Sequence, residues 1–401
     1  MQTFTLPWGA WHGDVQRTFQ VPDDWQLEVF TMDTDVVVSD EVVRQALERL
    51  RADMAVQKPG SAIIVVDDLT RPVDLSGLLP RMLDHMNAAG VTDDRIRVLI
   101  GLGSHAPLSE EDLQKKLGRV TLQRVACINH SPEETEPIGM EWGKTPIRLN
   151  RHYLAAEYKV VISGLTPHSF AGFSGGAKML VPGIADMETL TRTHKSVLMG
   201  FMGKLGSVEK NKFRDTIESF VEKAGLDYFF GLVINADRSI RALYDGHYVE
   251  AHRAASEYAA GFYRQPVNGP YDVVITSAYP KDTELLQAEN ALIPIKSGKE
   301  NLLKEGGTLI VMSACSQGPG HHGLFGVNGR LYRVPRPLRI LKPYQTAFFF
   351  ENITVEDFGH VFNSAYYFSA DWEALLNHVR PHISNAPRVA IFPYGSMQLT
   401  G

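Results

Sequence analysis

Short apolar runs rich in β-branched residues alternate with amphipathic helical windows along most of the chain, and this alternation limits the fold more than any other feature. The window 108–118, with Ser109 at its start and Gly118 at its end, shows typical helix boundaries. Strand–helix alternation favours parallel sheets flanked by helices. The sequence therefore predicts an α/β fold. The expected strands are 61–68, 96–105, 157–165, 271–280, 306–315 and 388–395.

The length of the chain and one polar segment predict two domains. A chain of 401 residues is too long for one ordinary core. The segment 264–272 is polar, contains proline and glycine, and follows a long helical window. We therefore expect an N-terminal domain over 1–267 and a C-terminal domain over 268–401, each with a largely parallel sheet. Active sites in such proteins favour the interdomain cleft, where this one is expected.

Composition and charge exclude several classes of partner. The formal net charge is −6, and no basic run with interleaved aromatics is present, so a nucleic-acid partner is not expected. Cys127 and Cys315 are far apart and form no metal-binding or disulfide pattern. The N-terminus lacks the pattern of a signal peptide, and no stretch approaches the ~20 apolar residues of a membrane helix. We therefore expect no membrane association and a cytoplasmic location.

Polar and basic residues follow three of the predicted strands. Thr70 and Arg71 come after the first, His105 after the second and His168 after the third. The carboxyl ends of parallel strands share one edge of a sheet, so these residues are expected to converge there. The Arg71 guanidinium suits a carboxylate or phosphate, and the alternative is a surface ion pair with a neighbouring aspartate.

His105 and His168 form a candidate acid–base pair. A racemase or epimerase needs one proton-transfer group on each face of the reacting carbon. Imidazole suits this task because its ordinary pKa lies near neutrality, so both protonation states are accessible. The alternative is that each histidine only hydrogen-bonds a strand end.

A glycine-rich loop within 168–178, "HSFAGFSGGAK", ends in Lys178. Successive backbone N–H groups with little side-chain obstruction can wrap an anion. The loop matches neither a Walker A nor a GxGxxG pattern, and the alternative is a tight turn that requires glycine. Lys178 is either a phosphate partner, a desolvated amine for covalent chemistry, or a surface lysine.

His194 is a candidate metal ligand in the helical window 187–197. Imidazole binds nickel, zinc and iron. However, no second ligand stands four residues away, and no HExxH pattern is present. A metal at this position would need ligands from something other than a protein cluster.

Several motifs together resemble the nickel-pincer lactate racemase family and its 2-hydroxyacid racemase and epimerase relatives. They occur in order over residues 60–320: "DDLTRP", "GLGSH", "PHSFAGFSGGAKMLVPGI", "TRTH" and "YPKD". The resemblance implies a two-domain α/β protein with a nickel-pincer nucleotide, Ni(II) pyridinium-3-thioamide-5-thiocarboxylic acid mononucleotide. That cofactor provides three nickel ligands, so the protein need provide only one. Cofactor-biosynthesis proteins are implied partners.

The resemblance also assigns roles by position. Lys178 would tether the cofactor, His194 would bind nickel, and Arg71 would bind substrate. The residues implied around the cofactor phosphate are Thr70, Gly172, Ser174, Gly175 and Gly176. His105 and His168 would exchange the substrate hydroxyl proton, while the C2 hydride moves to the cofactor ring and returns to the opposite face.

One helix departs from the family pattern. Where lactate racemases read YQxxK after "YPKD", this chain has Leu286, Gln287 and Asn290. Gln287 and Asn290 are expected to contact substrate, but a cation and an aromatic ring are lost. We therefore expect a 2-hydroxyacid other than lactate, longer or more polar, such as an aldonic acid. The family's "GGRK" is "GGAK" here, which alters the surroundings of the lysine rather than the tether.

The sequence thus predicts an isomerase that racemises or epimerises a 2-hydroxyacid at C2. Two alternatives stay open. One is a phosphate- or nucleotide-binding oxidoreductase with net redox turnover, and the other is a non-catalytic protein that binds the nickel cofactor. Retention of both His105 and His168 favours the enzyme, because a carrier has no need of two opposed bases.

Overall fold

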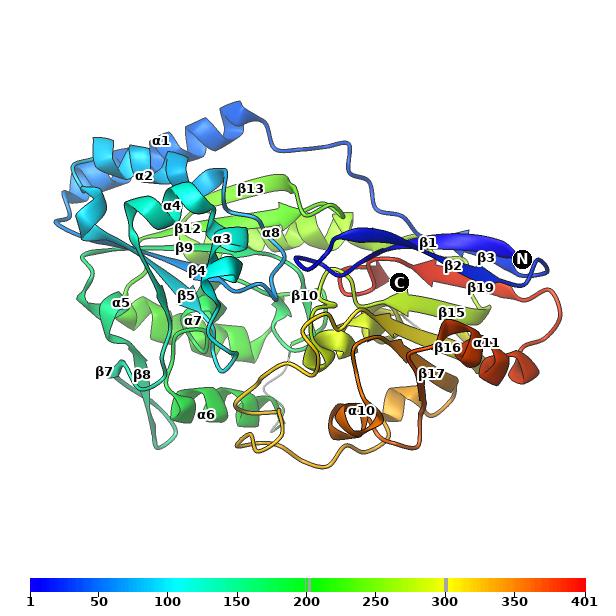
Figure 1. The fold of residues 1–401 in the computed structure, drawn as a ribbon. Coiled ribbons are helices and arrows are strands. Elements are labelled where there is room, and N and C mark those ends of the chain that lie inside the picture. Colours follow the sequence, from blue (N-terminus) through cyan, green and yellow to red (C-terminus); the bar gives the residue numbers. More distant parts are fainter. Residues whose placement is uncertain (199, 201–202, 299–301) are drawn as a thin grey trace. The chain divides into compact units, whose positions relative to one another are not determined.

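The chain forms two compact units (Figure 1). The computed structural model describes residues 1–198, 200, 203–298 and 302–401. One unit comprises residues 33–261, and the other comprises residues 1–32 together with 262–401. Within the described ranges, no helix combines the length and the apolar character that crossing a membrane requires.

The unit formed by residues 33–261 contains a six-stranded sheet in the order β13-β12-β9-β4-β5-β6. Only the β12–β13 pair is antiparallel. Every residue of β4 is buried, as expected for a parallel strand covered on both faces. The strands predicted over 61–68, 96–105 and 157–165 are thereby confirmed. The strands are β4 (Ala62–Asp67), β5 (Ile96–Gly101), β6 (Ala126–Asn129), β9 (Tyr158–Gly164), β12 (Tyr228–Ile234) and β13 (Ile240–Gly246).

Helices cover both faces of this sheet. In Figure 1, α1 and α2 lie along one face and α7 lies across the other. Ile63 and Val65 of β4 share a core cluster with Phe213 and Ile217 of α7. The helices are α1 (Asp40–Gln57), α2 (Leu78–Ala88), α3 (Glu110–Leu117), α4 (Arg119–Arg124), α5 (Arg151–Ala155), α6 (Met187–Leu198), α7 (Lys212–Ala224) and α8 (Tyr248–Phe262). The smaller elements are η1 (Asp93–Arg95), η2 (Gly176–Met179) and the hairpins β7 (Thr135–Trp142) with β8 (Thr145–Asn150) and β10 (Pro167–His168) with β11 (Gly172–Phe173).

The helix predicted over 108–118 is confirmed, including its boundaries. The Ser109 hydroxyl accepts a hydrogen bond from the Asp112 backbone N–H at 3.1 Å. At the other end, Gly118 has a φ of 77° and its N–H donates to the Gln114 carbonyl. Glycine is favoured there because a positive φ crowds a Cβ atom.

The second unit contains a six-stranded sheet in the order β18-β17-β16-β15-β19-β3, and all its strands are parallel. The strands predicted over 271–280, 306–315 and 388–395 are therefore confirmed. The strands are β3 (Gln26–Val29), β15 (Tyr271–Ser277), β16 (Leu303–Ser313), β17 (Gln345–Phe350), β18 (Tyr367–Ser369) and β19 (Arg388–Phe392). The other elements are η3 (Leu285–Leu292), α9 (Ile293–Ser297), η4 (Arg339–Leu341), α10 (Val355–Val361), α11 (Trp372–Val379), η5 (Arg380–His382) and the short pair β14 (Arg264–Gln265) with β20 (Leu399–Thr400).

The division into units differs from the predicted domains 1–267 and 268–401. The second boundary falls after residue 261, and residues 1–32 belong with the C-terminal residues. The physical reason is tertiary pairing, because β3 adds to the edge strand β19. In addition, the Asp282 carboxylate accepts the backbone N–H groups of Gly9 at 2.8 Å and Ala10 at 3.1 Å. The expected position of the active site in an interdomain cleft stays a prediction.

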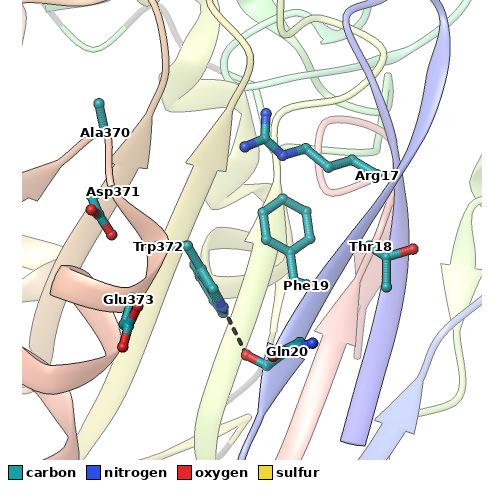
Figure 2. A pocket seen from close by; sticks show the side chains of 8 residues that line it. All are labelled: Arg17, Thr18, Phe19, Gln20, Ala370, Asp371, Trp372 and Glu373. Carbon is teal, nitrogen blue, oxygen red and sulfur yellow. Dashed lines mark hydrogen bonds between the residues drawn. The ribbon is translucent and has the colours of Figure 1, made fainter. Parts of the chain in front are cut away.

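An N-terminal hairpin, β1 (Gln2–Trp8) and β2 (Val15–Val21), packs on the second unit through aromatic rings. Figure 2 shows β2 facing the start of α11, where the Trp372 indole N–H donates to the Gln20 carbonyl at 2.8 Å. The Arg17 guanidinium lies 5.4 Å from the Phe19 ring centre and also pairs with Glu351. These contacts anchor the hairpin to the sheet that it covers.

Candidate active site

The candidate catalytic residues follow the carboxyl ends of three adjacent strands. β4 lies between β5 and β9, and Asp67 at the end of β4 is opposite Gly101 of β5. His105 follows β5 and His168 follows β9, so one strand, β4, lies between the two strands that the histidines follow. Arg71 follows β4 itself.

A buried carboxylate organises the residues after β4. Asp68 Oδ2 lies 2.5 Å from His105 Nδ1. Its other oxygen, Oδ1, accepts the Thr70 hydroxyl at 2.5 Å and the Thr70 backbone N–H at 3.0 Å. Arg71 Nη1 donates to the Thr70 hydroxyl oxygen at 3.0 Å. Asp68, Thr70, Arg71 and His105 therefore form one connected network, in which the Thr70 hydroxyl is directed to Asp68.

Asp68 keeps its charge in this network. Burial alone would raise its pKa, but His105, the Arg71 charge and the Thr70 hydrogen bond together hold the pKa well below its usual range. An ionised carboxylate can only accept hydrogen bonds, so the facing His105 Nδ1 carries a proton. In the neutral ring, the lone pair is then on Nε2, which is the tautomer a general base requires.

Phe170 connects the second histidine to the candidate metal ligand. Its ring centre lies 4.4 Å from that of His168 and 6.0 Å from that of His194, both nearly perpendicular. The Ala171 backbone N–H approaches His168 Nδ1 at 3.5 Å. The glycine loop therefore supports His168 directly and reaches His194 through one aromatic ring.

His194 is held as a neutral imidazole on α6. Its Nδ1 lies 2.9 Å from the Leu190 carbonyl oxygen, which can only accept, so Nδ1 carries the proton and Nε2 carries the lone pair. Burial, with smaller contributions from Lys178 and His105, lowers the pKa of His194 to about 4. A neutral imidazole with one nitrogen fixed by a backbone carbonyl is the form that binds metals.

Lys178 lies in η2, directly after the glycine loop, and its side chain is partly buried. Burial, the Arg71 charge and the Arg214 charge lower the pKa of Lys178 to about 7, while Asp68 acts in the opposite direction. Much of the amine is therefore unprotonated near neutral pH. An unprotonated amine is the nucleophilic form.

We expect Lys178 to acylate at unusually low pH. Competitive labelling with an amine-reactive anhydride, followed by peptide mass spectrometry, should show a midpoint near pH 7 for Lys178. Ordinary lysine amines become reactive only near pH ~10. A Lys178 midpoint in that ordinary range would contradict the environment described above.

The glycines of the loop are required by close packing. Gly172, Gly175 and Gly176 have φ values of 77°, 79° and 62°. A Cβ atom would collide with the Ser207 carbonyl at Gly172, with the Ser163 hydroxyl at Gly175, and with the His252 ring at Gly176. The Ser174 hydroxyl donates to the Gly164 carbonyl at 2.7 Å and accepts from Thr166 N–H at 2.9 Å. The tight-turn interpretation therefore accounts for the glycines, and the roles of this loop and of Thr70 at a phosphate stay predictions.

Gln287 and Asn290 lie on η3 in the other unit, so the structure leaves their contact with substrate as a prediction. Within η3, the Asn290 amide donates to the Gln287 backbone carbonyl at 2.8 Å and approaches the Gln287 side-chain oxygen at 3.3 Å. The two side chains therefore form one polar unit.

Two buried cations near the site carry no sequence signal of their own. Lys116 of α3 donates to Asp67 Oδ1 at 2.5 Å and to the Arg71 carbonyl at 2.8 Å. Arg214 of α7 is completely buried beneath the glycine loop. Lysine and arginine are common on exposed helix faces, so a sequence pattern alone does not distinguish these two. In the sequence, Asp67 and Asp68 could be recognised only as two acids at the end of a predicted strand. The contact of Asp68 with His105 became visible in the structure.

The residues that the structure describes contain no group of three or more histidine, cysteine, aspartate or glutamate side chains suited to a metal ion. The expectation that a metal at His194 would need ligands from outside the protein stays a prediction.

Residues 12–202 match the family described as "Lactate racemase N-terminal domain". The chain is 28% identical over 299 residues to lactate racemase of Thermoanaerobacterium thermosaccharolyticum, covering 71% of this chain and 68% of that one. It is 26% identical over 271 residues to lactate racemase of Lactiplantibacillus plantarum, covering 66% and 62%. The chain is therefore similar to lactate racemases, and the family match covers residues 12–202. The resemblance drawn from the motifs is thereby confirmed.

Solved structures agree with this family in their fold. The apoprotein of the T. thermosaccharolyticum lactate racemase matches with a TM-score of 0.77 at 22% identity, covering 100% of both chains. A Thermotoga maritima protein matches with a TM-score of 0.71 at 20% identity, covering 91% of this chain and 98% of that one. The predicted α/β class is thus confirmed.

Proposed function

We propose that this lactate racemase-like protein racemises or epimerises a 2-hydroxyacid at C2 with a nickel-pincer nucleotide. Similarity to two lactate racemases supports an isomerase of the racemase class. The observation that best supports this proposal is that His105 and His168 follow the strands on either side of β4. Neighbouring strands lie about 4.8 Å apart, so this separation suits a small molecule above the end of β4, next to Arg71.

In the proposed reaction the protein moves one proton and holds one carboxylate. Arg71 binds the substrate carboxylate with its planar guanidinium. His105 Nε2 takes the C2 hydroxyl proton, and Asp68 stabilises the imidazolium that results. His168 returns a proton to the same oxygen from the other side, and the reverse direction exchanges the two roles. When bound, the cofactor supplies a ring that accepts and returns the C2 hydrogen as hydride.

The residues near the site fit the cofactor chemistry in two respects. The Lys178 amine, with its pKa lowered to about 7, suits a covalent amide-type tether. The His194 imidazole, with Nδ1 fixed on the Leu190 carbonyl, can offer Nε2 to a nickel ion. Lys178 and His194 would hold the cofactor, and His105 and His168 would exchange protons with the substrate.

The His194→Ala variant is expected to retain at least about tenfold less nickel after purification, because the proposed protein ligand of the metal is removed. Nickel per protein, measured by inductively coupled plasma mass spectrometry, checks this. The control is His152→Ala on α5, whose side chain is partly exposed near Glu134. Equal nickel content in the His194→Ala variant and the wild type would contradict the assigned role.

We also propose that the substrate is not lactate. In η3, Leu286 and Asn290 stand where lactate racemases carry an aromatic ring and a lysine. An amide pair such as Gln287 and Asn290 binds hydroxyl groups better than it binds a bare methyl group. A longer, polyhydroxylated 2-hydroxyacid of the aldonic acid type fits this chemistry.

Chiral chromatography of a 2-hydroxyacid panel tests the function. The protein is co-expressed with the cofactor-biosynthesis proteins, and each pure stereoisomer is incubated with it. We expect stereoisomer exchange for at least one polyhydroxylated acid, with no accumulating keto acid. Accumulation of keto acid would favour the oxidoreductase alternative, and loaded protein without exchange would favour the cofactor-binding alternative.

A further inference from the structure

In the glycine loop, each backbone carbonyl of residues 170–175 accepts a hydrogen bond from another segment of the chain. Asn211 at the start of α7 donates to the Phe170 carbonyl at 3.0 Å. His252 of α8 contacts the Ser174 carbonyl at 2.8 Å, and the Gly206 N–H donates to the Gly172 carbonyl at 3.1 Å. The remaining three carbonyls, those of Ala171 (3.3 Å), Phe173 (2.7 Å) and Gly175 (3.4 Å), accept from Arg214.

Arg214 is therefore the main support of this loop. Its side chain is 0% exposed. The planar guanidinium has five N–H donors in a rigid fork, which lets one side chain hold three carbonyls. The loop lies directly on this support, since a Cβ atom at Gly176 would come within 2.7 Å of His252 and 3.3 Å of Arg214.

We propose that Arg214 is a positioning residue for Lys178: its buried guanidinium fixes the backbone from which Lys178 projects and places a permanent positive charge beneath it. The inference rests on the proposed role of Lys178 as the cofactor tether. Arg214 would act on Lys178 in two ways, because the same side chain sets the backbone geometry and the charge around the amine.

The charge of Arg214 is only weakly compensated by its surroundings. Glu218 Oε1 lies 3.9 Å from Arg214 Nη1, and Glu218 also binds Arg253 at 2.7 and 2.8 Å. Burial lowers the pKa of Arg214 to about 10, which leaves the guanidinium charged at neutral pH. His252 is neutral because burial lowers its pKa well below the ordinary value. A charged Arg214 disfavours protonation of Lys178 and favours an anion at the loop.

The test uses the apoprotein and two readouts, the pH midpoint of Lys178 acylation and hydrogen exchange in residues 171–177. In Arg214→Met we expect the midpoint to rise by roughly one pH unit and loop exchange to accelerate on the order of tenfold. Arg253→Met is the matched control, since the Arg253 guanidinium binds the same Glu218 carboxylate, and both readouts should stay at wild-type values.

The Arg214→Lys variant keeps the positive charge but lacks the planar guanidinium, so it separates the effect of charge from that of geometry. It replaces Arg214→Met in the test if the methionine variant does not fold. One ammonium cannot reach three carbonyls in a fork, so loop exchange should accelerate while the Lys178 midpoint stays near the wild-type value. Folded variants with wild-type midpoint and wild-type loop exchange would overturn the proposal. Because no cofactor or substrate is used, a wild-type protein that fails to exchange any stereoisomer would contradict the proposed function and leave this result intact.

Discussion

The His105→Ala variant is expected to lose stereoisomer exchange by about 10²–10⁴-fold, the usual contribution of a positioned acid–base group. His168→Ala should lose a similar factor, because inversion needs a proton donor on each side of the reacting carbon. Rates of exchange are measured by chiral chromatography on the substrate found in the panel. Both variants should keep the mass of the loaded wild-type protein at Lys178, since neither histidine holds the cofactor in this proposal.

Asp68→Asn distinguishes orientation of His105 from its chemistry. The amide lacks the charge that stabilises an imidazolium, so kcat should fall while the KM of the substrate changes little. His152→Ala, at a partly exposed position on α5, should exchange stereoisomers at the wild-type rate. Loss of the Lys178 adduct in both the His105 and His168 variants would show that these residues hold the cofactor instead.

The Lys116→Met variant is expected to lose about 3–5 kcal/mol of the free energy of unfolding, the usual cost of leaving a buried charge unpaired. Lys116 is 0% exposed and holds both Asp67 and the Arg71 carbonyl. Asp67 Oδ2 also accepts the Gly164 N–H at 2.9 Å, so this ion pair joins the ends of β4 and β9. Urea unfolding followed by circular dichroism measures the change.

The loss should depend on pH with a defined sign. Burial already raises the pKa of Asp67 in the folded protein, and Lys116 acts against that rise. Without Lys116, the folded pKa of Asp67 rises further above its unfolded value. A raised acid pKa gives stability that is present at low pH and lost as pH rises through the folded pKa. The deficit of Lys116→Met should therefore shrink as the solution is acidified.

Two further variants complete this test. Asp67→Asn combined with Lys116→Met removes the unpaired charge but keeps an acceptor for Gly164, so much of the lost stability should return. Lys115→Met removes the neighbouring lysine, which is partly exposed and pairs at 2.9 Å with the exposed Glu111, and it should change stability by less than about 1 kcal/mol. Equal effects of Lys115→Met and Lys116→Met would contradict the burial argument.

Much of the fold was predictable because its signals are local. Each buried strand, such as β4, is a short apolar run, and the ends of α3 are marked by Ser109 and Gly118. The motifs around His105, His168 and Lys178 were also readable, because each is one contiguous segment of the sequence. The predicted boundaries assigned residues 1–32 to the N-terminal domain, whereas the structure groups them with residues 262–401. Local patterns did not indicate this, because β3 pairs with β19 across more than 350 residues of sequence.

The α/β class, the resemblance to lactate racemases and the residue types that bear chemistry could all be read from local sequence patterns. The contacts between them became visible only in the folded chain: Asp68 with His105, Lys116 with Asp67, and Arg214 with the carbonyls of the glycine loop. A charged side chain on a helix is common in solvent, and it contributes strongly to stability or to a site only when folding buries it. Burial depends on contacts between distant segments, and local patterns do not encode those contacts.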